Sequence, residues 1–120
     1  MAQRNPPEAE HEMMKYRQQY EKLAHSYEKT SVNLQAFKQR LHEVTETLKE
    51  LEKQPDDTTT YKFVGQVMFQ VDKVKIQDDL KMEKKRLEDT VPRFEQKLEE
   101  TKQEITEIAT KIQALGQGSQ

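Results

Sequence analysis

The sequence predicts a mainly α protein, in which a long antiparallel two-helix coiled coil carries one β-hairpin at its closed end. Two observations predict the helices: apolar residues recur at alternating steps of three and four in both halves of the chain, and Pro55-Asp56-Asp57 separates the halves. A third observation predicts the hairpin, because apolar and polar residues alternate over residues 58–71, TTTYKFVGQVMFQV.

The composition favours a thin, elongated protein over a globular one. The chain has 120 residues, of which 32% are hydrophobic and 35% are charged, so little apolar surface is available for a globular core. The formal net charge is −2, with acidic and basic residues interspersed. Because such a chain lacks the basic patch that nucleic acid or an anionic membrane attracts, we expect neither as a partner.

The sequence also lacks targeting signals. It has no cysteine, which excludes disulfides and thiolate zinc sites. No run approaches the roughly 20 apolar residues of a membrane span, and the start, MAQRNPPEAE, has no apolar signal-peptide core. We therefore expect a cytoplasmic protein.

The first helix is expected over residues 11–54, after a mobile tail of residues 1–10. Pro55 ends it, because the residue before a proline disfavours the helical conformation. Thr30 is the one polar residue in its seam of a and d heptad positions, and this regularity is typical of a coiled coil. The seam consists of Met13, Tyr16, Tyr20, Leu23, Tyr27, Thr30, Leu34, Phe37, Leu41, Val44, Leu48 and Leu51.

Residues 55–72 are expected to form a linker and the hairpin, which turns near Gly65. A hairpin alone is marginally stable in water and leaves strand edges unpaired beside an apolar face. Because no other segment of the chain supplies strands, the hairpin should assemble with hairpins of other subunits. The residues assigned to this oligomerisation are Tyr61, Phe63, Val64, Gly65, Val67, Phe69 and Val71.

The second helix is expected over residues 73–115, capped by Asp72 and followed by a mobile tail of residues 116–120. Pro92 lies inside it but outside the seam, either as a hinge for the distal arm or as a tolerated bend. Its seam, whose polar members are Thr101 and Lys84, comprises Ile76, Leu80, Lys84, Leu87, Val91, Phe94, Leu98, Thr101, Ile105, Ile108, Ile112 and Leu115. The two seams pair antiparallel about residues 64–65, where the strand pattern also turns.

No group of residues has the pattern of an active site. His11, His25 and His42 lie off the seam and far apart along one helix, and adjacent carboxylates diverge around a helix. We therefore expect no catalytic residue, no metal and no cofactor.

Apolar residues near the open end of the coiled coil are candidates for contact with a non-native protein, because methionine suits adaptable surfaces. For the tyrosines of this region, ordinary seam packing is the alternative. The client-binding candidates are Met13, Met14, Tyr16, Ile108, Ile112 and Leu115.

The segment from Pro55-Asp56-Asp57 through Tyr61-Lys62, Val64-Gly65 and Asp72-Lys73 to Leu80 resembles prefoldin subunits of the beta class, which have one hairpin and not two. Eukaryotic members look nearest and archaeal beta subunits next, whereas Pro92 departs from their more regular second helix. The resemblance implies an ATP-independent chaperone, a heterohexamer of two alpha-class and four beta-class subunits joined by their hairpins. It also implies that unfolded clients such as actin and tubulin are held at the coiled-coil tips and passed to a cytosolic group II chaperonin.

Two other functions are compatible with parts of the pattern. A structural coiled-coil tether would explain the heptads, but it would not need the strands at 58–71. A prefoldin-like subunit of another assembly would share every feature. An enzyme has no support in the sequence.

Overall fold

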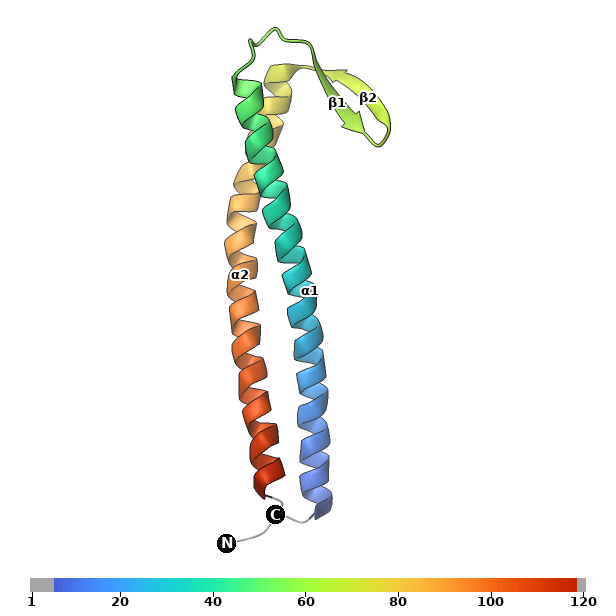
Figure 1. Ribbon diagram of the computed structural model, residues 1–120, viewed down its shortest axis with the longest axis vertical. Coiled ribbons are helices and arrows are strands. Elements are labelled where there is room, and N and C mark those ends of the chain that lie inside the picture. The colour runs from blue at the N-terminus through green and yellow to red at the C-terminus, as the bar shows by residue number, and fades with distance from the viewer. Residues whose placement is uncertain (1–5, 119–120) are drawn as a thin grey trace. The chain divides into compact units, whose positions relative to one another are not determined.

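The computed structural model describes residues 6–118 and contains two long helices separated by a β-hairpin (Figure 1). The order of elements is α1 (Pro6–Glu52), β1 (Thr60–Val64), β2 (Val67–Val71) and α2 (Lys73–Gly118). This confirms the predicted fold class.

The helices extend further than the sequence predicted at their outer ends. The helix α1 begins at Pro6, so residues 6–10 are helical and not part of a tail. Proline is tolerated there because the first amides of a helix have no intrahelical acceptor. The helix α2 continues through Gly116 to Gly118, since glycine weakens a helix by about 1 kcal/mol without ending it. Residues 1–5 and 119–120 of the expected tails lie outside the described residues.

The inner ends lie close to their predicted positions. The helix α1 ends at Glu52, two residues before the expected end. Asp72 occupies the cap position of α2, where its carbonyl oxygen accepts the Ile76 amide at 3.0 Å. Pro92 lies within an unbroken α2, as the in-phase seam around it predicted.

The chain divides into two compact units. The hairpin unit comprises Leu34–Arg93, and the terminal unit comprises the residues up to Asn33 and those from Phe94 onward. In the hairpin unit, the last turns of α1 and the first turns of α2 share an apolar core. Its buried members are Val44, Leu48 and Leu87, and Phe37, Leu41 and Leu80 pack against them.

The terminal unit is packed differently. Among its described residues, the side chains classed as buried are Thr30, 3% exposed, and Thr101, 6% exposed. Its apolar seam residues are only half-buried, and Tyr20, which the heptads place on the seam, is 40% exposed. The Thr101 hydroxyl donates a hydrogen bond to the Lys97 carbonyl at 2.8 Å, which satisfies this polar group inside the seam.

Candidate functional site

The β-hairpin is the best-defined candidate site of the hairpin unit. Its two strands pair antiparallel in the register Thr60 with Val71 through Val64 with Val67, so Gly65 and Gln66 form a two-residue loop. The sheet has two strands, which leaves the outer edge of each strand open to further pairing.

Gly65 fixes the turn. Its φ angle is 63°, and no other described residue has a positive φ. A two-residue hairpin loop with positive φ at its first position has the pattern of a type II′ turn, which favours glycine there. The predicted turn near Gly65 is therefore confirmed.

The register places the apolar residues on both faces of the hairpin, not on one. Cross-strand partners share a face, and Phe63 pairs with Met68 whereas Lys62 pairs with Phe69. If every second residue from Tyr61 to Val71 lay on the same side, the hairpin would have one apolar face. The two-residue loop instead places the odd-numbered residues of β1 on the same face as the even-numbered residues of β2. The uncharged face thus consists of Tyr61, Phe63, Met68 and Gln70, and the Lys62 face consists of Thr60, Lys62, Val64, Val67, Phe69 and Val71.

Both faces are open to solvent. Of the residues assigned to oligomerisation, the large apolar ones between Tyr61 and Phe69 are 52% to 68% exposed, and Val71 is half-buried. Met68, which is absent from the predicted set, is 53% exposed and completes the uncharged face beside Phe63. Its period-two position on the second strand was visible in the sequence, but its face depends on the register.

A buried lysine attaches the linker to the start of α2. Lys73 is 3% exposed, and its ammonium group lies 3.3 Å from the Asp56 carboxylate and 3.3 Å from the Gln77 side-chain oxygen. A buried ammonium group requires such partners. The contacts thus hold the linker beside the first turn of α2. The Asp72-Lys73 sequence alone did not reveal this role.

A second polar contact joins the two helices of the hairpin unit. The Arg40 guanidinium donates two hydrogen bonds to the Glu83 carboxylate, one of them 2.8 Å long from Nη2 to Oε2. These bonds lower the pKa of Glu83 despite its partial burial, and the charges of Arg40, Arg86 and Lys62 lower it further.

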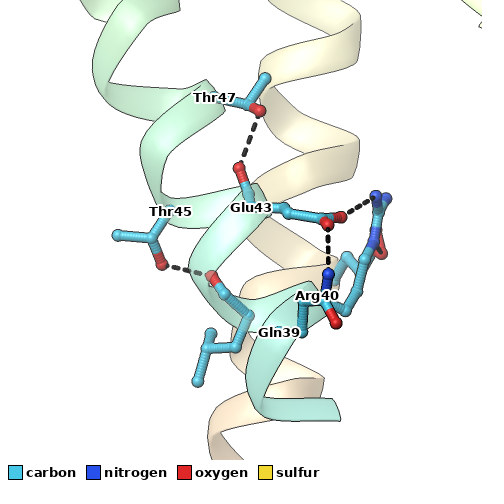
Figure 2. A network of polar contacts seen from close by, with 7 residues as sticks. Gln39, Arg40, Glu43, Thr45 and Thr47 are labelled. Carbon is cyan, nitrogen blue, oxygen red and sulfur yellow. Dashed lines mark hydrogen bonds and ion pairs between the residues drawn. The ribbon is translucent and has the colours of Figure 1, made fainter. Parts of the chain in front are cut away.

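Further polar groups surround Arg40 on α1 (Figure 2). The Glu43 carboxylate accepts a hydrogen bond from the Gln39 amide at 3.5 Å and lies 3.8 Å from Arg40 Nη1. The hydroxyl groups of Thr45 and Thr47 donate to backbone carbonyls one turn earlier, at 2.7 Å each. Thr45 is half-buried and the other groups are exposed, and no nucleophile and base meet among them.

In the terminal unit, the client-binding candidates have different exposures. Met14 is 61% exposed, whereas the seam members are half-buried between the helices, namely Met13, Tyr16, Ile108, Ile112 and Leu115. Lys111 Nζ lies 5.7 Å from the centre of the Tyr16 ring, within the range of a cation–π contact. The tyrosine thus packs in the seam and carries a charged neighbour above its face.

No group of three potential metal ligands converges among residues 6–118. A groove of about 410 Å³ in the hairpin unit is lined by lysines, glutamates, Thr45 and Leu48, which do not form a nucleophile–base pair. Within the described chain, neither helix has a stretch that is long and apolar enough to span a membrane.

Two long helices separated by a two-stranded hairpin with exposed apolar side chains define the class of the chain as a helical coiled-coil protein that carries one β-hairpin. The family model described as "Prefoldin subunit" matches residues 12–119. The chain belongs to the prefoldin subunit family, and its similarities place it in the beta class. The family consists of subunits of chaperone complexes.

Individual relatives agree with this assignment. The chain is 30% identical to a prefoldin subunit beta of Sulfolobus acidocaldarius over 118 residues, which cover 92% of this chain and 91% of the relative. It is 34% identical to the prefoldin subunit beta of Thermococcus gammatolerans over 74 residues, or 62% and 63% of the two chains. The crystal structure of the prefoldin beta subunit from Thermococcus strain KS-1 matches with a TM-score of 0.55 and 25% identity, covering 94% of this chain and 96% of that one.

Proposed function

We propose that this chain is one of the beta-class subunits of a heterohexameric, ATP-independent chaperone that also contains two alpha-class subunits. In this proposal the hairpin joins the subunits in the cytoplasm, and the ends of the helices hold unfolded proteins such as actin and tubulin. The complex then delivers these clients to a group II chaperonin.

The observation that carries the proposal is the uncovered hairpin. Its two outer strand edges are unpaired in the two-stranded sheet, and apolar side chains of both faces are more than half exposed. Open edges beside exposed apolar groups favour association with further strands. Membership of a family of chaperone-complex subunits supports sister subunits as the source of those strands.

Assembly is tested by measuring the molar mass by light scattering, for this chain alone and mixed with a candidate alpha-class subunit. A discrete hexameric mass that appears only in the mixture is the expected result. A stable homodimer that does not change with several alpha-class partners would instead support a structural tether.

The packing of the terminal unit supports client contact there. Its described apolar seam residues are half-buried, and its buried side chains are threonines, so separating the helix ends exposes apolar groups without breaking a tight apolar core. Met14 is already exposed and offers a flexible thioether to an irregular apolar chain.

Client contact is tested with serine substitutions in the assembled complex. The combined variant Met14→Ser, Ile108→Ser and Ile112→Ser should suppress aggregation of unfolded actin several-fold less well than the parent complex, while the hexameric mass is unchanged. Met82→Ser is the matched control, because Met82 is 64% exposed but lies in the hairpin unit. Equal suppression by the triple variant and the parent would exclude the helix ends as the client site.

A further inference from the structure

One groove of the hairpin unit gathers lysines from both helices. It has a volume of about 410 Å³ and receives four residues from α1 and four from α2. The net charge of the chain is −2, yet the groove is lined by four lysines and two glutamates and is therefore locally basic. The lining residues are Thr45, Leu48, Lys49 and Glu52 of α1 and Lys81, Lys84, Lys85 and Glu88 of α2.

The groove follows one flank of the seam between the helices. In a coiled coil, the position after d and the position before a lie on opposite flanks. Thr45 and Lys81 each follow a d residue, whereas Arg40 and Glu83 each precede an a residue. The Arg40–Glu83 pair therefore joins the helices on the far flank. On the groove side, no ion pair of the described chain joins a lining residue of α1 to one of α2.

The lysines of the groove are only weakly neutralised. Lys49 and Lys84 each pair with a glutamate of their own helix, at 3.2 Å and 3.9 Å, and ion pairs with such solvent access contribute little. Lys81 and Lys85 are exposed and form no ion pair with any residue of 6–118. Two ammonium groups of one helix face are thus open to an anionic partner.

The glutamates lie at the two ends of the groove. Glu52 is the last residue of α1, next to the linker, and Glu88 is the lining residue of α2 furthest along the chain from the hairpin. The lysines lie between them, so the groove is negative at both ends and positive in the middle. A ligand of the opposite order fits these charges, with carboxylates in its centre and a basic group at each end. A nucleic acid carries a phosphate at every step and would meet the glutamates.

The length of the groove suits a short peptide. The four lining residues of each helix span about 10 Å along its axis, which three or four residues of an extended chain cover. Leu48 and the methylene stems of the lysines add apolar contact below the charges. A single small anion would use only part of this surface.

We propose that this groove binds a short acidic peptide segment of another protein, with its carboxylates on the lysines and a basic residue at each end beside Glu52 and Glu88. The site contains no residue of the hairpin and none of the client-binding candidates. It therefore goes beyond the proposed function, and its test does not require assembly with other subunits.

The order of charges is tested with two labelled hexapeptides and the full chain, using fluorescence anisotropy to measure the dissociation constant. The first peptide has four glutamates flanked by one lysine at each end, and the second has the same composition with both lysines in the middle. The flanked peptide should bind at least about threefold more tightly. Its affinity should fall as salt is added, because exposed charges are screened. Equal affinity of the two peptides, or no detectable binding of either, would overturn the proposal.

The location of the site is tested with two double variants that remove the same charge. Lys81→Gln with Lys85→Gln should weaken binding of the flanked peptide at least about fivefold. Lys75→Gln with Arg86→Gln is the control, since these residues are exposed on α2 outside the groove, and it should stay within about twofold of the parent. Equal weakening by both double variants would overturn the assignment. Tighter binding of a six-nucleotide single-stranded DNA, lost in the groove variant, would replace the peptide by nucleic acid.

Discussion

The turn residue Gly65 shows how one backbone angle determines the geometry of the hairpin. Its φ of 63° is strained for any residue with a β-carbon, yet an added β-carbon would have nothing within 4 Å. A substitution there therefore tests backbone strain alone, without a steric clash. We expect Gly65→Ala to destabilise the turn by about 1–2 kcal/mol.

Gly116 provides the control for this substitution. It is a helical glycine in α2, an added β-carbon there also meets nothing within 4 Å, and its φ lies outside the positive region. Gly116→Ala should stabilise the helix by about 1 kcal/mol. Assembly with an alpha-class subunit should weaken for Gly65→Ala and stay unchanged for Gly116→Ala. Equal assembly by both variants would show that the strained turn is dispensable.

The Arg40–Glu83 pair predicts a pH dependence. The pKa of Glu83 is lowered from its ordinary 4.5, mainly by the hydrogen bonds from Arg40. The folded protein thus binds this proton more weakly than the unfolded chain, so the pair stabilises the fold fully above pH 4.5 and loses this effect as the pH falls through the lowered pKa. Glu83→Gln should reduce the free energy of unfolding by about 1 kcal/mol at pH 7.

The pH profile of urea unfolding checks this prediction. The difference between Glu83→Gln and the parent should be constant at neutral pH and should shrink below pH 4.5. The control is Glu50→Gln, since the Glu50 side chain is 70% exposed and its ion-pair partner is Lys53, three residues later and just past the end of α1. It should change stability by no more than about 0.5 kcal/mol. A difference for Glu83→Gln that grows on acidification would contradict the proposed role of the pair.

At the scale of the elements, the heptads predict the helices well because the seam spacing directly encodes which side chains meet. Their outer ends were predicted less well. Pro6 and Gly116 are unfavourable inside a helix, but proline fits its first turn and a single glycine near its end is tolerated. The alternation of residues predicted the strands, whereas the two-residue loop decided which side chains share a face.

Polar contacts between distant residues were outside the reach of the sequence patterns. Lys73 and Asp56 are 17 positions apart, and Arg40 and Glu83 are 43 positions apart. Heptad positions describe apolar spacing and do not specify which charged side chains meet across the helices. The burial of Lys73 is likewise a result of how the linker folds back on α2.

In the terminal unit, replacing the buried Thr101 should change the stability of the helices. Thr101 is 6% exposed, and its hydroxyl bonds to a carbonyl of its own helix, which weakens helices slightly. Thr101→Val should stabilise the terminal unit by about 1 kcal/mol, because the added methyl group is buried. Slower amide hydrogen exchange in residues 94–118 is the measurement.

The control for this change is Thr110→Val. Thr110 is exposed, and its hydroxyl donates to the Thr106 carbonyl at 2.9 Å in the same manner. Because the new methyl group stays in water, exchange should be nearly unchanged. Similar protection by both substitutions would mean that helix propensity, and not seam packing, causes the effect.

At the scale of the whole molecule, burial is distributed unequally between the two compact units. The buried apolar residues of the described chain all lie in the hairpin unit, namely Leu34, Val44, Leu48, Leu87 and Val91. Tight apolar cores resist local opening, whereas segments with few buried apolar contacts open at lower free energy. We therefore expect the hairpin unit to resist local unfolding and the terminal unit to unfold locally at lower free energy.

Native-state hydrogen exchange tests this distribution in the free chain. Amides of residues 37–48 and 80–91 should exchange at least about tenfold more slowly than those of residues 13–27 and 101–112. The interior Val44→Ala variant, which removes buried methyl groups from a side chain 1% exposed, should reduce the difference. Uniform protection along both helices would contradict the inferred division.

The open edges of β1 and β2 also affect the balance between subunits in a cell. Unpaired strands beside exposed apolar groups are templates for indiscriminate pairing, and this hazard persists in every copy that has no partner. Each strand is only five residues long, which limits the template but does not remove it. If this chain were synthesised in excess of its partners, the unpaired copies would expose their hairpins and tend to aggregate. We therefore expect the cell to coordinate expression of the subunits or to degrade the excess rapidly.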